Sequence, residues 1–190
     1  VVAVLTEDRQ KRHVDEYNLS NYDASVLTSD KAISDYFDNV INSDFSLKAS
    51  SKIVVNWITS ELFSILNENN LEIINSPIKP KDLGKLVKLI NEDIISGKIA
   101  KEVLIEMFNT KSDPQIIIDK KGLKQVTNTD EIEAFVDEVI EENKKMVEQY
   151  LSGKDKLLGF FVGQSMKKSK GKANPQILNE IIKKKLSKKN

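Results

Sequence analysis

The sequence predicts an all-α protein, and three observations lead to this prediction. Apolar residues recur at a spacing near 3.6 residues along most of the chain, and residues suited to begin and end helices stand between these segments. Only one short run, the three isoleucines at 116–118, favours a β-strand. Because no second candidate strand is available to pair with it, we expect a short helix or an extended connector there.

Six apolar stripes mark the expected helices. The stripes are Val54, Trp57, Ile58, Leu62 and Leu66; Leu83, Leu86, Val87, Ile90 and Ile94; Ile99, Val103, Leu104, Met107 and Phe108; Ile132, Phe135, Val136, Val139 and Ile140; Leu158, Phe161, Val162 and Met166; and Ile177, Leu178, Ile181, Ile182 and Leu186. Trp57 is expected to anchor a core rather than to stack on a ligand, because it lies within such a stripe.

Residues between the stripes predict helix ends. Asp113-Pro114 and Asn174-Pro175 each place a side-chain acceptor before a proline, which suits the first helical position. Ser96-Gly97 and Ser152-Gly153 are expected to end helices.

The chain is expected to form two helical domains. Residues without helical periodicity concentrate in 109–129, which divides a larger domain at 1–115 from a small one at 116–190. In the small domain, Gly159 and Gly163 lie four residues apart and are expected to let a neighbouring helix pack closely. Because the opening residues, VVAVL, resemble an internal segment more than a translation start, we expect a fragment of a longer protein.

Composition excludes several kinds of site. Cysteine is absent, so disulfides, cysteine-type zinc sites and thiol nucleophiles are excluded. The single histidine, His13, lies among charged residues, and we expect it to be exposed and without partners. No apolar stretch approaches the ~20 residues that span a bilayer. Since no secretory signal pattern is present either, we expect a soluble, cytosolic protein.

No active site is expected in these residues. The tripeptides at 96–98 and 152–154 (SGK) lack the other residues of a phosphate-binding loop. The acidic residues of 130–142 are expected to be solvated rather than to bind a metal. We therefore expect no catalytic residue, metal site or cofactor in this chain.

The net charge of zero conceals two segments of opposite sign. Residues 1–143 carry 16 basic and 26 acidic side chains, a net charge of −10, whereas residues 144–190 carry 13 lysines and 3 acidic side chains, a net charge of +10. Such a basic segment favours a polyanionic partner, and nucleic acid is the commonest one. The alternative is that the lysines serve solubility.

The basic residues concentrate between two expected helices, at Lys167, Lys168, Lys170 and Lys172, just before the helix start at Asn174. Lysines supply point charges for phosphates, and the helix start offers free backbone N–H groups and a positive dipole end. The basic segment has few aromatic residues, which disfavours stacking on unpaired bases. We therefore expect these five residues to bind a folded RNA through its backbone and shape.

Several motifs resemble a known family. The matching strings are 17–28 (YNLSNYDASVLT), 35–37 (DYF), 56–57 (NW) with 61–62 (EL), 76–77 (SP), 95–103 (ISGKIAKEV), 122–125 (GLKQ), 159–164 (GFFVGQ) and 171–175 (GKANP). In this order they resemble the C-terminal part of the B subunit of the bacterial and organellar aspartyl/glutamyl-tRNA amidotransferase, including its YqeY-like tail.

This resemblance implies part of an enzyme, built from a catalytic cradle, a helical connecting domain and a YqeY-like tail. The cradle would precede Val1. It would use ATP and Mg²⁺ to amidate Glu-tRNA(Gln) or Asp-tRNA(Asn). The ammonia would come from the glutaminase, which is the A subunit, and a small C subunit would belong to the same enzyme. The tail would bind the outer corner of tRNA(Gln) or tRNA(Asn), rather than DNA or a membrane. The setting would be the bacterial cytoplasm or an organellar matrix.

Two other interpretations remain open. One is a protein–protein interaction module in which the acidic residues of 130–142 and the basic end neutralise each other or a partner. The other is a stand-alone YqeY-like module without a cradle. The strings within residues 1–45 disfavour the second, since they belong to the amidotransferase.

Overall fold

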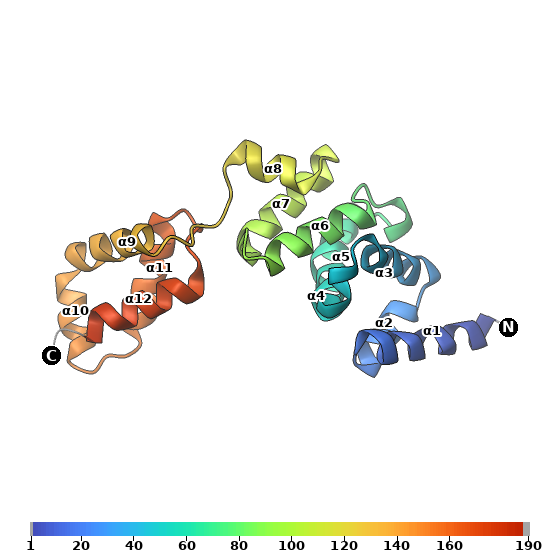
Figure 1. Cartoon of the computed structure of the whole chain (residues 1–190), viewed down its shortest axis with the longest axis horizontal. Coiled ribbons are helices and arrows are strands. Elements are labelled where there is room, and N and C mark those ends of the chain that lie inside the picture. Colours follow the sequence, from blue (N-terminus) through green and yellow to red (C-terminus); the bar gives the residue numbers. More distant parts are fainter. Residues whose placement is uncertain (1, 188–190) are drawn as a thin grey trace. The chain divides into compact units, whose positions relative to one another are not determined.

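The computed structural model describes residues 2–187 (Figure 1). Val1, which opens the sequence, and Lys188 and Lys189 of the basic segment lie outside these residues. Across the described chain, helices are joined by turns, and the one β-type pairing is an isolated bridge between Val126 and Ala173. The all-α prediction is confirmed.

Most of the expected helices are present, with shorter elements between them. The elements are α1 (Val2–Tyr17), α2 (Asn21–Thr28), α3 (Lys31–Ser43), the 3₁₀ helix η1 (Phe45–Ser50), α4 (Ser51–Asn56), the π-helical η2 (Trp57–Leu62), α5 (Phe63–Glu68), the 3₁₀ helix η3 (Ile73–Asn75), α6 (Pro80–Asn91), α7 (Gly97–Thr110), α8 (Pro114–Lys121), α9 (Thr129–Glu142), α10 (Lys144–Leu151), α11 (Leu157–Lys168) and α12 (Pro175–Ser187).

The chain divides into two compact units. Unit 1 comprises Val1–Glu92 and Ala100–Lys121, and unit 2 comprises Asp93–Ile99 and Gly122–Asn190. The boundary expected after residue 115 differs from this division, because residues 116–121 form the end of α8, which packs on α6 within unit 1. Nothing in the sequence indicated that residues 93–99 belong with the second unit.

The isoleucine run at 116–118 is helical, as the first of the two alternatives had it. It lies within α8, where Ile117 and Ile118 are buried and Ile116 faces solvent. The β-branched side chains are therefore accommodated by burial on one face of a short helix, which outweighs their strand preference.

The helix stripes form the cores, and Trp57 is buried as expected. One of the two predicted helix stops is correct and the other is wrong. Ser152 follows the last residue of α10, as predicted, but Ser96-Gly97 begins a helix instead of ending one. The Ser96 hydroxyl accepts a hydrogen bond from the Ile99 N–H at 3.3 Å, which is the role of an N-cap residue.

Close helix packing occurs at Gly84, and not at the two glycines that the sequence suggested. A Cβ placed on Gly84 of α6 would lie 2.5 Å from Ser43 Oγ and 3.0 Å from Leu47 Cδ1. Since these atoms belong to α3 and η1, both elements pack against α6 at a distance that suits glycine, which has no Cβ. A Cβ on Gly159 or Gly163 would meet no neighbouring atom within 4 Å. The prediction for α11 was wrong, because both glycines lie on its exposed side.

His13 is buried, which corrects the expectation of an exposed side chain. Its ring makes an edge contact with Phe37, with ring centroids 5.1 Å apart, and its Nε2 donates to Asp38 Oδ1 at 3.1 Å. Arg12 donates to the other oxygen of Asp38 at 2.5 Å. The charged residues beside His13 in sequence suggested exposure, yet one of them, Arg12, binds the same carboxylate as the buried ring.

Asp38 is therefore predicted to stabilise unit 1 more than an exposed acid on the same helix does. In Asp38→Ala, His13 and Arg12 lose their acceptor, and an unsatisfied buried group costs about 1–3 kcal/mol. Asp35→Ala is the matched control, since Asp35 is more exposed and pairs with Arg9 and Lys31. Urea unfolding followed by circular dichroism measures both, and equal losses would contradict the prediction.

The contribution of Asp38 should also depend on pH. Burial raises the pKa of its carboxyl, but hydrogen bonds from His13 and Arg12 outweigh burial and hold the pKa below its usual value. A lowered pKa stabilises the fold above the unfolded-state pKa of about 4, and this contribution is lost as pH falls through the folded-state pKa. The stability gap between wild type and Asp38→Ala should thus narrow in acid.

Candidate nucleic-acid interface

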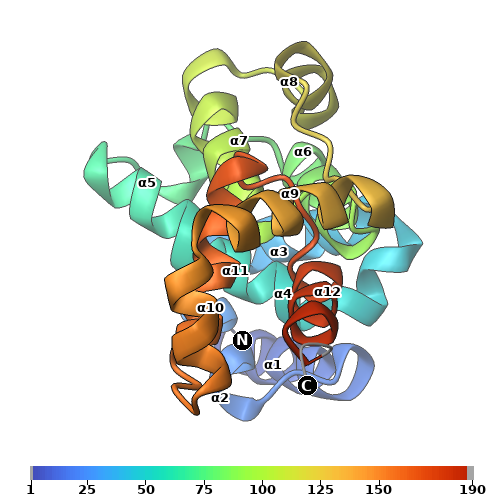
Figure 2. The ribbon, with the colours of Figure 1, turned by 90° about the vertical axis from the view of Figure 1, so that its left-hand side faces the viewer.

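Unit 2 is a small helical bundle in which α9 lies across α11 and α12 (Figure 2). Its core combines the apolar faces of α9, α10, α11 and α12 with Ala173 of the loop between α11 and α12. The buried residues are Ile132, Val136, Val139, Ile140, Val147, Phe161, Ala173, Leu178, Ile181, Ile182 and Leu186. The expected stripes supply almost all of these residues. The basic loop connects α11 to α12 and is fixed at both ends by this core.

The basic loop, residues 169–174, has a defined backbone. Lys170 and Gly171 both adopt positive φ angles, of 54° and 76°, and the Gly171 N–H donates to the Met166 carbonyl at 2.8 Å. These bonds end α11 in the way that left-handed caps do. The Ser169 hydroxyl, which accepts from the Ala173 N–H at 3.1 Å, holds the loop from inside.

A connecting segment fixes the same loop from the other side. The Val126 N–H donates to the Lys172 carbonyl at 2.7 Å, and the Asn174 N–H donates to the Val126 carbonyl at 2.9 Å. In Figure 1 this segment runs from α8 towards α9 and passes beside the loop between α11 and α12. The backbone that carries the lysine side chains is thus held by hydrogen bonds on both sides.

The four predicted lysines differ in their surroundings. Lys167 and Lys170 are exposed and Lys172 is half-buried, and none of the three forms an ion pair with a residue that the structure describes. Lys168 instead lies between two carboxylates of α9, 2.9 Å from Glu138 and 2.7 Å from Glu142. These hydrogen bonds, from Glu142 first and Glu138 second, raise the pKa of its ammonium group.

The acidic face of α9 has a second basic partner at the end of the chain. Lys185 of α12 lies 2.7 Å from Asp137 and 3.2 Å from Glu133. The sequence predicted that the acidic face of α9 is solvated. In the structure this face instead neutralises Lys168 of α11 and Lys185 of α12, the two helices that α9 crosses. The charge separation visible in the sequence is partly cancelled in the fold.

Asn174 caps α12, as its position before a proline predicts. Its side-chain oxygen accepts from the Gln176 N–H at 3.0 Å and the Ile177 N–H at 3.1 Å, and the residue is buried at 7% exposure. Two N–H groups that were expected to be free for a phosphate are satisfied by the protein. The geometry gives Asn174 the role of positioning the helix.

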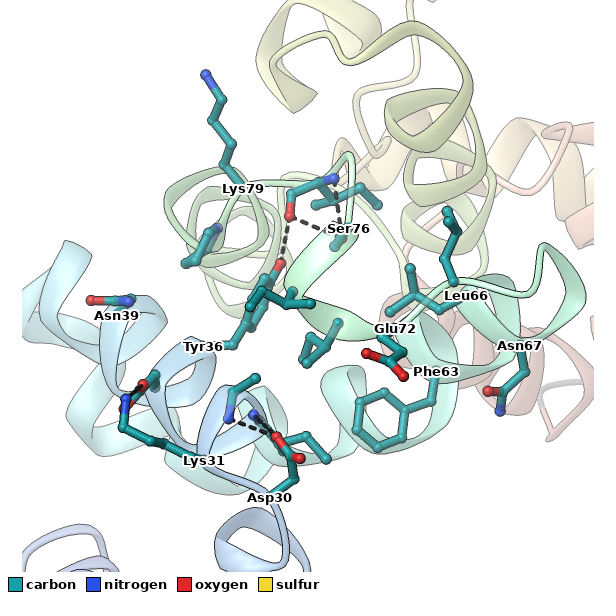
Figure 3. Close-up of a pocket in the computed structure, with 18 residues that line it drawn as sticks. Asp30, Lys31, Tyr36, Asn39, Phe63, Leu66, Asn67, Glu72, Ser76 and Lys79 are labelled. Atoms are coloured by element: carbon teal, nitrogen blue, oxygen red, sulfur yellow. Dashed lines mark hydrogen bonds and ion pairs between the residues drawn. The ribbon is translucent and has the colours of Figure 1, made fainter.

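A cavity in unit 1 brings no reactive groups together. It has a volume of about 890 Å³, and Figure 3 shows it between α3, α5 and the η3 segment. Asp30 is occupied in capping α3, and the Tyr36 hydroxyl donates to the Ile78 carbonyl at 2.9 Å. Burial raises the pKa of this hydroxyl, so it stays protonated.

Among residues 2–187, no three side chains of the metal-binding types come together. In the same residues, no helix combines the length and the apolar character needed to cross a bilayer.

Comparison with known proteins supplies the family. The model described as the GatB domain matches residues 35–186, which lie in both units. The chain belongs to the GatB domain family. This match confirms the resemblance that the sequence motifs indicated.

Curated relatives of this GatB domain chain share one name, which is that of the B subunit of aspartyl/glutamyl-tRNA(Asn/Gln) amidotransferase. The protein from Pelagibacter ubique is 48% identical over 185 residues, which are 97% of this chain and 37% of that protein. Those from Alkalilimnicola ehrlichii and Nitrosococcus oceani are 47% and 49% identical, and the chain covers 37% and 38% of them. The chain thus spans a little over a third of the length of these relatives.

Loss of the Asn174 cap is predicted to destabilise unit 2. Asn174→Ala leaves two N–H groups of α12 without a partner, which costs about 1 kcal/mol. Gln176→Ala on the same helix is the control, because Gln176 is exposed and an exposed change stays within about 0.5 kcal/mol. Thermal unfolding followed by circular dichroism compares them, and a stable Asn174→Ala variant would show that the cap is dispensable.

Proposed function

We propose that this chain is the tRNA-binding C-terminal part of the B subunit of a tRNA-dependent amidotransferase. In this role, unit 2 binds the outer corner of tRNA(Gln) or tRNA(Asn) while the misacylated end reaches a catalytic cradle elsewhere in the same polypeptide. The complete enzyme would convert Glu-tRNA(Gln) or Asp-tRNA(Asn) into the amidated form. The membership in the GatB domain family and the names of the relatives support this assignment.

The observation that carries the proposal is the group of lysines without carboxylate partners at the end of α11. The acidic helix α9 lies in the same unit and neutralises Lys168 and Lys185, yet Lys167, Lys170 and Lys172 form no ion pair with a described residue. Like charges held near one another repel, and binding of a polyanion would relieve this repulsion. A phosphate backbone provides that charge.

Recognition by shape fits this surface better than recognition of bases. The aromatic rings of the basic helices pack on one another: Phe161 makes edge contacts with Phe160 and Tyr150, with centroids 5.5 Å and 6.4 Å apart. These rings are engaged in the core, so stacking on unpaired bases is disfavoured. Backbone contacts to folded, double-stranded parts of the RNA remain.

The other parts of the reaction are assigned outside this chain. Among the described residues, no three metal-binding side chains come together. We assign ATP and Mg²⁺ to the part of the polypeptide that the chain does not span. The proposed protein partners are the glutaminase, or A subunit, together with the small C subunit, in the bacterial cytoplasm or an organellar matrix.

A protein–protein module remains a second candidate, and one observation favours it. The ion pairs of α9 with Lys168 and Lys185 are those expected if acidic and basic segments neutralise each other. This candidate explains two lysines but leaves Lys167, Lys170 and Lys172 unexplained. The two candidates therefore differ in what these three lysines bind.

Removing the three unpaired lysines is predicted to weaken the salt dependence of tRNA binding. Each lost phosphate contact lowers the slope of log K against log salt by about 1. Lys167→Ala, Lys170→Ala and Lys172→Ala together should flatten it by up to roughly 3, measured by fluorescence anisotropy with a tRNA(Gln) transcript. Melting temperature should change little, because none of the three lysine side chains forms an ion pair with a described residue and substitutions away from buried or paired groups cost within about 0.5 kcal/mol.

A matched control removes equal charge from three positions that precede α11 in the chain. Lys145, Lys154 and Lys156 are exposed, precede that helix, and form no ion pair with a described residue. A triple alanine variant at these positions should keep the wild-type slope. If both triple variants keep the wild-type slope, the proposed tRNA site is absent and the protein–protein interpretation is favoured.

The choice of RNA feature gives a separate prediction. A transcript with a disrupted elbow should bind more weakly than intact tRNA(Gln), whereas anticodon substitutions should have little effect, because backbone contacts at the outer corner do not read the anticodon. Competition against a labelled intact transcript measures both. Equal competition by the elbow variant would contradict recognition of the outer corner.

A further inference from the structure

Residues 93–99 bring a further lysine to the basic loop. This segment belongs to unit 2 although it lies far from residues 169–174 in sequence. The Gln125 N–H donates to the Ile94 carbonyl at 2.6 Å, and the next residue, Val126, bonds to Lys172 and Asn174. Three separate segments are thereby joined by backbone hydrogen bonds.

Lys98, within the first of these segments, lies against the turn at Gly171. A Cβ placed on Gly171 would be 3.9 Å from Lys98 Cδ and 3.9 Å from its Nζ. Gly171 stands between Lys170 and Lys172 in the chain, so the ammonium group of Lys98 lies beside the backbone that carries both. The sequence offered Lys98 only as the end of an incomplete phosphate-loop motif.

The position of Lys98 is electrostatically unfavourable without an anion. It is the second residue of α7, whose first turn contains no acidic side chain, and a cation near a helix N-terminus opposes the helix dipole. It is exposed and forms no ion pair with any described residue. By contrast, Lys101, three residues further on, pairs with Glu61 at 2.8 Å.

We infer that Lys98, Lys170 and Lys172 form one phosphate-binding site at the Gly171 turn, so that the RNA-binding surface extends to residues 93–99. This inference rests on the proposed tRNA-binding function and adds to it a residue from outside the basic segment. The hydrogen bonds through Gln125 and Val126 fix the segments that carry the three lysines. The site is thus preorganised for a phosphate of the RNA backbone.

The test compares single lysine variants in the whole chain. Lys98→Ala should lower the salt slope for the tRNA(Gln) transcript by about 1, as loss of one phosphate contact does. Lys98→Arg keeps the charge and should retain most of the slope. Lys101→Ala removes the same charge from the same helix, at a lysine already paired with Glu61, and should leave the slope at the wild-type value.

A stability measurement separates binding from folding. Because Lys98 opposes the dipole of α7, Lys98→Ala should melt at the wild-type temperature or slightly above it. A second variant, Lys170→Gly, removes a charge at a positive φ that glycine adopts without strain, and should likewise bind more weakly without losing stability.

The possible results distinguish this inference from the proposed function. A wild-type slope in Lys98→Ala, together with a flattened slope in the triple variant at Lys167, Lys170 and Lys172, overturns the role of Lys98 and leaves tRNA binding intact. Wild-type slopes in both overturn the proposed function as well. An equal loss in Lys98→Ala and Lys101→Ala would reflect net charge alone and would also overturn the site.

Discussion

The two backbone hydrogen bonds of Val126 are the constraint on which the basic surface depends. They tie an otherwise irregular connector to the loop between α11 and α12, with N···O distances of 2.7 Å to Lys172 and 2.9 Å from Asn174. Backbone donors and acceptors at a buried position need partners, and Ala173, between the two bonded residues, is fully buried. These bonds restrain the backbone of the loop that carries Lys170 and Lys172, and a restrained backbone has less entropy to lose if a partner binds.

Charge in unit 2 is distributed by pairing rather than by segment. The acidic side chains of α9 form ion pairs with Lys168 and Lys185, which come from the two helices that α9 crosses. The exposed ion pairs add little stability individually, but they decide which cations remain available. The lysines near the Gly171 turn form no ion pair with a residue that the structure describes.

Unit 1 is organised by close contacts and a buried polar group. Gly84 lets α6 approach α3 and η1 at a distance that a larger side chain would prevent. On α3, Asp38 joins Arg12 and the buried His13 of α1. Both features fix the position of α3, which also forms one wall of the large cavity.

The sequence by itself determined the features that depend on neighbours along the chain. Helical periodicity and caps such as Asn174-Pro175 require residues within four positions of one another, so the all-α class, most helices and the core stripes were predictable. The motif order likewise indicated the family. The positions of the basic residues could also be read directly, which is why the lysine cluster at 167–172 was identified in advance.

The tertiary structure decided which of those residues meet distant partners. The pairing of Lys168 with α9, the burial of His13 and the approach of Lys98 to Gly171 all join segments far apart in the chain. Local patterns contain no information on such pairings, because two helix faces of the same composition can face a core, an ion-pair partner or solvent. Only the packing of α9, α11 and α12, with the connector between them, fixed which lysines remained unpaired.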